Sequence, residues 1–435
     1  MNTPVWDFIE NYVNQNPVRL HMPGHKGAGQ QESYDLTEVE DADVLYHATG
    51  ILKESMENAA AIFGAGKTVY SAEGASLAIR AMVYLTRLYA VSNRKKPVIA
   101  AARNAHSTFV TAAALLDVEV NWLFGQSLLS CKLDPAFLED YLQDHSVAAV
   151  YVTSPDYLGN VADIAGLAAV CHRHDTLLLV DNAHGAYLRF LGRHPLQLGA
   201  DICCDSAHKT LPVLTGGAYL HIGKAAPAVF YEQAEKAMAL FASTSPSYLI
   251  LGSLDRANQY LAEEQDYPAF ADRVEQLKRR LGEKGFVLLG DEPIKLTIAP
   301  KTYGYRGVEL AALLKEQNMV CEFADPDYLV LMVTPQNPEE DLRKLEGFLT
   351  ELPRKSAIEE AVPAMSKPAR AMSMHEAIMH PAKTVAAESC LGKVLAAPTV
   401  SCPPAVPILV CGEVIDRTAI ELMRYYGHET LDVIK

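Results

Sequence analysis

A lysine flanked by hydrogen-bonding side chains stands directly after a predicted buried strand. The stretch DICCDSAHKTLP places Ser206, His208 and Lys209 in a turn behind an apolar run that ends at Asp205. Proteins with α/β sheets bind ligands at the carboxyl ends of their strands. A lysine shielded from water there has a lowered pKa and can attack a carbonyl to form a Schiff base. By itself, the pattern also suits an ordinary surface lysine.

A carboxylate follows another apolar strand, in the stretch LLLVDNAHGAYL. Asp181 ends this strand, and Asn182, Ala183 and His184 come next. A buried carboxylate needs a cationic or hydrogen-bonding partner, because burial otherwise neutralises it. A protonated pyridine nitrogen is such a partner. A helix cap or a turn is the alternative role for Asp181 alone.

Two earlier stretches add a candidate anion site and a candidate stacking ring. In YSAEGASLAIRAM, the residues Gly74, Ala75 and Ser76 open a predicted helix. The first amides of a helix bind phosphate. In AARNAHSTF, His106 lies between a predicted strand and a helix, where an imidazole can stack on a flat ligand. A capping or core histidine is the alternative.

The four stretches together predict pyridoxal phosphate as the cofactor. They offer an amine for the Schiff base, an acid for the ring nitrogen, a helix N-terminus for the phosphate and a ring for stacking. The stretch CHRHD at 171–175 has metal-ligating residue types but no matching second pair, so we expect no metal.

The elements that position these residues alternate along residues 55–250. Helical patterns alternate with short apolar runs at 97–101, 147–154, 176–181 and 200–206. Such runs are typical of buried parallel strands with crossover helices. The sequence therefore predicts an α/β fold with a mostly parallel sheet.

The predicted organisation has four parts. They are an N-terminal arm (1–30), a large cofactor-binding domain (31–255), a small α+β domain (256–355) and a C-terminal segment (370–435). A Pro- and Ala-containing stretch joins the last two. The charged pattern from 255 to 285 predicts one long amphipathic helix.

Composition excludes several classes of protein. The chain has 435 residues, 49% hydrophobic and 21% charged, with a net charge of −15. Nucleic-acid and anionic-membrane binders usually carry a basic surplus, so we expect neither partner. We find no secretory signal and no membrane segment. The eight irregularly spaced cysteines favour reduced thiols in a cytoplasmic enzyme.

Over nearly its whole length the chain resembles the bacterial ornithine/lysine/arginine decarboxylase family, particularly its shorter Firmicutes-type members. The most specific stretches are RLHMPGHKG (19–27) and DSAHKTLPVLTGGAYLH (205–221). TSPDYLG (153–159), VDNAHGAY (180–187), TSPSYLILGSLD (244–255) and PPAVPILVCGE (403–413) support them. The resemblance implies the aspartate-aminotransferase-like fold, fold type I of the pyridoxal phosphate enzymes, and decarboxylation of a basic L-amino acid.

The resemblance also implies a role for each matching residue. Lys209 would hold the cofactor covalently, Asp181 would pair with its ring nitrogen, and His184 would lie near the reacting carbon. The other implied cofactor contacts are His106 and Ala183 on the ring, and Gly74, Ala75, Ser76, Ser206 and His208 at the phosphate, with Thr244 and Ser245 contributed by a neighbouring subunit. The implied substrate contacts are Asp156, Tyr157 and Glu413.

The resemblance implies a homodimer or higher oligomer with shared active sites. The large inducible decarboxylases begin with a receiver-like domain that this sequence lacks, which favours a role in polyamine biosynthesis.

Three stretches depart from the family pattern. The family usually reads Asp-Glu-Ala-His, whereas this chain has Asn182 in second place. Its phosphate loop is usually Asn-Gly-Ser/Thr-Thr/Ser-x-Gly, whereas here Glu73 precedes Gly74 and Ala75. Its tyrosine-Pro-Pro-Gly becomes CPPA at 402–405. These changes leave two alternatives open: another pyridoxal phosphate reaction such as aminotransfer, or a catalytically weakened homologue.

Overall fold

The computed structural model describes residues 1–124, 132–263, 265–402 and 406–435. These residues form two compact units. The first unit comprises Met1–Pro97, Pro135–Tyr151 and Ile164–Asp266, and the second comprises Val98–Asp134, Val152–Asp163 and Tyr267–Lys435. The four-part division expected from the sequence stays a prediction.

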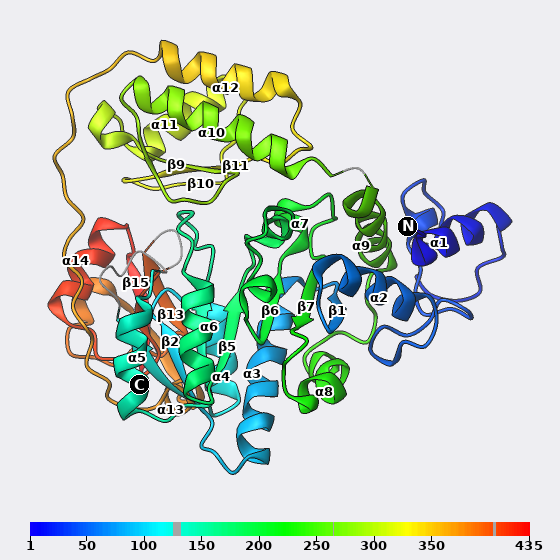
Figure 1. The fold of residues 1–435 in the computed structure, drawn as a ribbon. Coiled ribbons are helices and arrows are strands. Elements are labelled where there is room, and N and C mark those ends of the chain that lie inside the picture. Colours follow the sequence, from blue (N-terminus) through cyan, green and yellow to red (C-terminus); the bar gives the residue numbers. More distant parts are fainter. Residues whose placement is uncertain (125–131, 264, 403–405) are drawn as a thin grey trace. The chain divides into compact units, whose positions relative to one another are not determined.

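A seven-stranded sheet carries the strands expected from the sequence, in the order β1-β7-β6-β5-β4-β2-β3 (Figure 1). Neighbours β5 and β6 are parallel, as are β2 and β3, whereas β7 runs antiparallel to both β6 and β1. The strands are β1 (Lys67–Ser71), β2 (Val98–Ala102), β3 (Glu119–Leu123), β4 (Ala149–Thr153), β5 (Leu177–Asp181), β6 (Ile202–Asp205) and β7 (Ala218–Ile222). Every residue of β5 and β6 is buried, which explains their continuous apolar runs.

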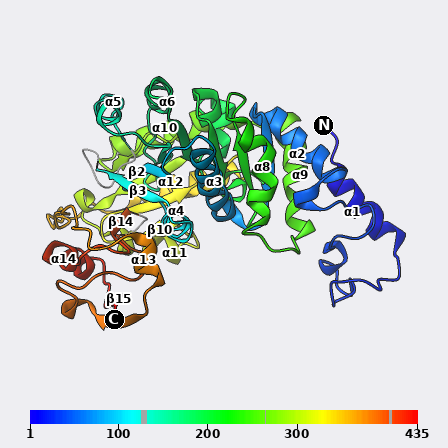
Figure 2. The same ribbon diagram turned by 90° about the horizontal axis from the view of Figure 1, so that it is seen from below.

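The helices of the first unit lie before, between and after its strands in the chain. They are α1 (Pro4–Gln15), α2 (Ile51–Phe63), α3 (Gly74–Ser92), α5 (Pro135–Asp144), α6 (Ile164–Arg173), α7 (Ala207–Thr210), α8 (Ala228–Ala239) and α9 (Tyr248–Glu263), with 3-10 turns η3 (Ala186–Leu191) and η4 (Pro195–Leu198). Helices α1, α2 and α9 pack together (Figures 1 and 2). Helix α2 ends at Phe63. The next residue, Gly64, caps it in a left-handed backbone conformation, which glycine adopts without a side-chain clash.

The prediction of one long helix over 255–285 is wrong. Helix α9 ends at Glu263, and a separate helix α10 spans Tyr267–Glu283. Pro268 explains why the second helix begins where it does. Proline lacks an amide hydrogen and is therefore tolerated in the first turn of a helix but not in its interior.

The second unit contains a four-stranded antiparallel sheet in the order β10-β11-β9-β8. Its strands are β8 (Val287–Leu289), β9 (Lys295–Ala299), β10 (Phe323–Ala324) and β11 (Leu329–Met332), and its helices are α10, α11 (Gly307–Glu316) and α12 (Glu339–Glu351). This part matches the α+β pattern of strands and helices that the sequence predicts after residue 285.

The C-terminal part of the second unit forms two small two-stranded antiparallel sheets, β12 with β15 and β13 with β14. Its elements are α13 (Met374–Met379), β12 (Ala382–Ala386), β13 (Thr399–Cys402), β14 (Val406–Val410), α14 (Arg417–Tyr425) and β15 (Thr430–Ile434). Ile408, Leu422 and Val433 belong to a common apolar core there. The second unit also holds α4 (Ser107–Leu115), which follows β2.

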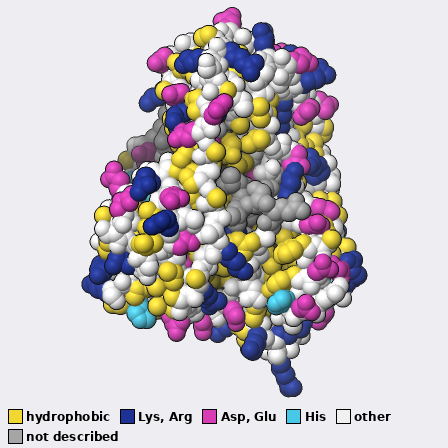
Figure 3. Space-filling model, turned by 90° about the vertical axis from the view of Figure 1, so that its left-hand side faces the viewer, with side chains coloured by type: hydrophobic (Ala, Val, Ile, Leu, Met, Phe, Trp, Pro, Cys, Tyr) yellow, Lys and Arg dark blue, Asp and Glu magenta, His cyan; other side chains and the backbone are white. Residues whose placement is uncertain are grey.

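Charged groups of both signs are interspersed on the surface drawn in Figure 3. Within the described part of the chain, no helix combines the length and apolar character needed to cross a membrane. The six cysteines whose side chains are described, including Cys203 and Cys204, are all free thiols.

Candidate active site

The Lys209 amine lies beside an imidazole at the ends of β5 and β6. Lys209 lies on the short helix α7, and its Nζ is 3.0 Å from His184 Nε2. His184 is buried, whereas Lys209 is partly exposed. The sequence places these residues after two different strands. The parallel pairing of β5 with β6 brings both strand ends to one edge of the sheet.

Asp181 is buried, and its carboxylate accepts hydrogen bonds from three groups. One carboxylate oxygen accepts a hydrogen bond from the Tyr151 hydroxyl at 3.1 Å. The other accepts from the Ala183 amide at 3.2 Å and from the Cys204 thiol at 3.6 Å. Burial and the nearby Asp181 charge raise the pKa of Cys204 well above its usual value, so the thiol keeps the proton that it donates. The carboxylate therefore has a fixed orientation.

Two neighbouring glycines, Gly216 and Gly217, accept hydrogen bonds from the start of helix α3 and from the turn that bears Lys209. The Gly74 amide donates to the Gly216 carbonyl at 2.7 Å. His208 donates from its backbone amide to the Gly217 carbonyl, and its Nδ1 lies 3.0 Å from the same oxygen. Gly216 has φ +100, and a Cβ there would approach the Ala72 carbonyl oxygen to 2.8 Å, so only glycine fits. The predicted phosphate residues Gly74 and His208 are thus brought together.

Glu73 is turned toward a neighbouring loop. Its carboxylate accepts a hydrogen bond of 2.7 Å from the Ser243 amide. Ser243 also accepts from the Ser245 amide through its hydroxyl, so the exposed segment that holds Thr244 and Ser245 is attached to the start of α3 within one chain. This contact engages the carboxylate that the altered loop introduces next to Gly74.

The first unit offers a donor set that fits pyridoxal phosphate. Gly74 has a left-handed backbone with φ +71, and a Cβ built on it would meet no atom within 4 Å, so there is open space at the start of α3. The amides that follow Gly74 in the first turn of the 19-residue helix α3, with the positive end of the helix dipole, could bind an anion at this end. An amine at Lys209 and a buried carboxylate at Asp181 complete the set.

The other predicted contacts lie in the second unit. His106 caps helix α4, with its side chain accepting from the Thr108 amide. Asp156 is buried and accepts two hydrogen bonds from Asn160, both at 2.8 Å. The Tyr157 hydroxyl donates to Glu322 at 3.0 Å. The roles of His106, Asp156 and Tyr157 toward cofactor and substrate stay predictions.

Glu413 forms a buried ion pair that the sequence did not indicate. Its two oxygens accept from Arg103 at 2.9 and 2.7 Å. Arg103 also donates to the carbonyls of Pro407 and Ile408 and lies over the Trp122 ring. The predicted role of Glu413 in holding a substrate cation stays a prediction, with the difference that its charge is already paired. Residues 403–405 of the altered CPPA stretch lie outside the described residues.

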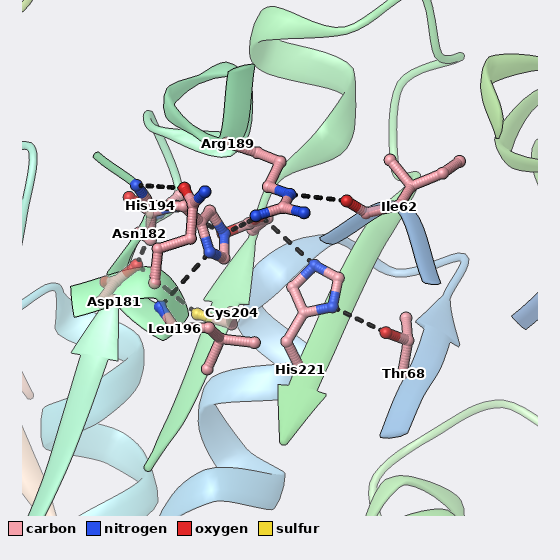
Figure 4. Close-up of polar contacts among 12 residues, drawn as sticks. Ile62, Thr68, Asp181, Asn182, Arg189, His194, Leu196, Cys204 and His221 are labelled. Atoms are coloured by element: carbon pink, nitrogen blue, oxygen red, sulfur yellow. Dashed lines mark hydrogen bonds and ion pairs between the residues drawn. The ribbon is translucent and has the colours of Figure 1, made fainter. Parts of the chain in front are cut away.

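Sequence reasoning missed a buried polar network beneath this site. Asp205 accepts hydrogen bonds from Asn182 and His194, and His221 lies beside them. All four side chains are fully buried. Figure 4 shows Asn182, His194 and His221 close to one another. The signal in the sequence was weak: Asn182 and Asp205 stand next to predicted site residues, but nothing local links either to His194 or His221. The histidines of the CHRHD stretch instead pair with carboxylates, His172 with Asp201 and His174 with Glu139.

The chain belongs to the Orn/Lys/Arg decarboxylase family. Residues 3–283 match the model of that family's major domain. The fold is that of the fold type I pyridoxal phosphate enzymes, and the protein is an enzyme of the lyase class. The resemblance drawn from the sequence motifs is therefore confirmed.

Curated relatives match along almost the entire chain. An arginine decarboxylase of Bacillus subtilis is 28% identical over 466 residues, covering 96% of this chain and 92% of the relative. An arginine decarboxylase of Halalkalibacterium halodurans is also 28% identical, covering 99% of this chain and 94% of the relative.

Solved structures share the fold at lower identity. Lysine decarboxylase A from Pseudomonas aeruginosa superposes with a TM-score of 0.81 at 16% identity, over 99% of this chain and 80% of that one. The constitutive lysine decarboxylase of E. coli gives 0.77 at 18% identity, over 100% and 82%.

Proposed function

We propose that this protein uses pyridoxal phosphate to decarboxylate a basic L-amino acid, releasing CO2 and the corresponding amine. The observation that carries the proposal is the grouping of Lys209, His184 and Asp181 at one edge of the sheet, in a chain of this family. When bound, the cofactor supplies an electron-withdrawing ring that accepts the electrons of the bond broken as CO2 leaves.

Different residues of the first unit would bind different parts of that cofactor. Lys209 provides the amine that attaches to it. Asp181, oriented by Tyr151 and the Ala183 amide, provides a fixed negative charge for the protonated ring nitrogen. Ala75 and Ser76 at the start of α3, with Ser206 and His208, would bind the phosphate group. Gly74, whose amide donates to the Gly216 carbonyl, would leave space beside that group. Ala183 packs against the ring.

His184 and Lys209 are the groups placed to move a proton. Their nitrogens are 3.0 Å apart, within hydrogen-bonding distance, so one can hold the proton that the other releases. A proton must reach the α-carbon after CO2 leaves, and a general acid within hydrogen-bonding reach performs that step. We propose that His184 and Lys209 share it.

The substrate is a basic amino acid, and arginine is the first to test. The near-full-length curated relatives named above carry the name arginine decarboxylase, which supports this order. Asp156, Tyr157 and Glu413 remain the proposed substrate contacts, together with His106 as the proposed ring contact.

A product assay tests the proposal directly. The purified protein with pyridoxal phosphate is incubated separately with L-arginine, L-lysine and L-ornithine, and CO2 and amine products are measured by mass spectrometry. We expect an amine from one of the three. Keto-acid products, or no product while the cofactor absorbs in the visible range on the protein, would overturn it in favour of another pyridoxal phosphate reaction.

A trapping experiment tests the cofactor residue. Borohydride reduction followed by peptide mass spectrometry is expected to find the cofactor on Lys209, and the label is expected to disappear in Lys209→Ala. A label retained in that variant would show that another lysine holds it.

We further propose a homodimer or higher oligomer with shared sites, acting in the cytoplasm and supplying amines for polyamine synthesis. Light scattering at several protein concentrations tests the first point, and a monomer that keeps full activity would contradict it.

A further inference from the structure

Asn182 and Asp205 join the two strand ends that carry the catalytic groups. In the parallel register of β5 and β6, Asp181 pairs with Cys204, and the Asn182 amide donates to the Cys204 carbonyl at 3.0 Å. Beyond this last backbone bond, Asn182 Nδ2 donates to Asp205 Oδ1 at 2.7 Å. One side chain directly follows Asp181, and the other directly precedes Ser206 and the α7 turn that bears Lys209.

The contacts of Asn182 define which end of its amide faces Asp205. Its Oδ1 is buried and has no hydrogen-bond partner among the described residues, so the bond to Asp205 is what orients this side chain. With the amide turned over, its oxygen would face a carboxylate oxygen, which is repulsive. The donor role therefore belongs to residue 182 and the acceptor role to residue 205.

The side chains around Asp205 favour its charged form. His194 Nε2 lies 3.0 Å and His221 Nε2 lies 3.4 Å from its second oxygen. Burial by itself would raise the pKa of Asp205, but the two histidines hold it well below its usual value. His221 is anchored through Nδ1 to the Thr68 hydroxyl at 2.8 Å. The acceptor is thus an anion with nitrogen partners on both oxygens.

The same two histidines and Asp205 are side chains of a type that binds metals, and their ligand atoms lie within 4.8 Å of one another. The Leu196 amide donates to His194 Nδ1, so Nε2 carries the ring proton and donates it to Asp205. A proton on Nε2 leaves no lone pair there for a metal. The geometry is that of a hydrogen-bonded network.

We propose that Asn182 and Asp205 are a matched amide–carboxylate pair that positions Asp181 relative to Lys209. The pair requires one partner of each kind. Two carboxylates in contact in this buried place would repel each other, and two amides would offer too few acceptor oxygens for the Asn182 and His194 donors. The inference rests on the proposed function.

A polarity exchange tests the pairing. The variants are Asn182→Asp, Asp205→Asn and the double exchange, each titrated with pyridoxal phosphate and followed by its visible absorption. Loss of a buried bond to a charged group corresponds to about tenfold weaker binding or more, so we expect that loss in each single variant. In the double variant, the amide introduced at position 205 can donate to the carboxylate introduced at position 182, while the amide oxygen accepts from His194. We expect its affinity to return to within about threefold of the natural protein.

Urea unfolding of the cofactor-free proteins separates positioning from stability. Asn258→Asp is the matched control, because Asn258 also lies in a buried network, where it donates to the Tyr70 hydroxyl and the Ser55 carbonyl. We expect this control to unfold more easily but to bind the cofactor as tightly as the natural protein. If Asn182→Asp does not fold, Asn182→Ala removes the same donor without adding a charge, and we expect the same weakening.

Three results would overturn the pairing: single variants that bind the cofactor normally, a double variant no better than the weaker single, or one tightly bound metal ion per chain removed by His194→Ala. If the natural protein itself binds no pyridoxal phosphate, the proposed function fails, and this inference fails with it. A natural protein that binds the cofactor normally while the exchange fails to restore binding would overturn the pairing alone.

Discussion

Two fully buried carboxyl groups of the first unit, Asp205 and Asp255, have pKa values that are shifted in opposite directions by their surroundings. Asp205, at the end of β6, is surrounded by His194, His221 and an amide, and its pKa is held well below the usual value. Asp255, on α9, accepts from the Val5 and Trp6 amides and the Ser55 hydroxyl, yet burial raises its pKa to about 6. Neutral donors at the start of helix α1 do not offset the desolvation, whereas two imidazoles do.

The comparison separates a functional region from a packing region. The Asp205 network lies under the strand ends that carry Asp181 and Lys209, where a fixed arrangement is needed. The Asp255 contacts attach helix α1 to α9, where a carboxyl group works as a hydrogen-bond acceptor whether or not it is charged. Burial alone therefore does not determine whether a carboxyl group is charged. The identity of its hydrogen-bonding and charged partners determines this.

The largest effect is expected from removing the carboxylate at Asp205. In Asp205→Ala, Asn182 and His194 keep their buried donors but lose the acceptor, so the free energy of unfolding at pH 7 should fall by about 3–5 kcal/mol. Asp205→Asn keeps one acceptor oxygen and should lose less. Urea unfolding measures both. Equal losses in the two variants would mean that the acceptor oxygens are not what matters.

Arg103 and Glu413 extend the comparison to the second unit. Arg103→Met leaves the buried Glu413 without its cation, and we again expect a loss of about 3–5 kcal/mol. Arg103→Met with Glu413→Gln removes both charges and should recover much of that loss. Thermal or urea unfolding of the single and double variants measures the coupling. Losses that simply add would contradict a paired role for Arg103.

The pH dependence of stability should differ between natural protein and Asp255→Asn. The folded-state pKa of Asp255, about 6, lies above its ordinary value of 3.8, so its ionisation costs stability as pH rises between these values. Relative to the natural protein, Asp255→Asn should become more stable by about 3 kcal/mol between pH 3.5 and pH 7. Asp205 has the opposite sign: its contribution is present above pH 3.8 and is lost in stronger acid.

Unfolding measured across that pH range checks the Asp255 assignment. Asp175→Asn is the control, since it makes the same substitution at an exposed side chain. A constant difference between natural protein and Asp255→Asn over the range would show that the carboxyl group titrates normally.

The smallest effect is expected at the surface. Lys95 pairs with Asp175 at 2.7 Å, but the Asp175 side chain is 85% exposed. Lys95→Ala should therefore change the free energy of unfolding by less than about 1 kcal/mol, and salt should remove most of the change. A loss as large as that of Asp205→Ala would show that distance, rather than burial, sets the value of these pairs.

Local patterns in the sequence predicted the strands β2, β4, β5 and β6, because a buried parallel strand is a short apolar run bounded by polar residues. They failed for the helix over 255–285, where the apolar spacing continues although α9 ends at Glu263 and a separate helix, α10, begins at Tyr267. The motif residues Lys209, Asp181 and His184 were identified because each stands at a strand end. The paired state of Glu413 was not, since Arg103 lies far away in the chain.

The sequence by itself determined the family, the mostly parallel α/β fold and the residues that stand at the strand ends, since these depend on periodicity and short motifs. Only the tertiary structure determined which side chains become hydrogen-bond partners of the buried carboxyl groups. Asp205 meets Asn182, His194 and His221 because strand order and register bring β5, β6, β7 and a loop after η3 to one place. Hydrogen-bond partners that are distant in sequence leave no local pattern, and those partners determine whether a buried carboxyl group is charged.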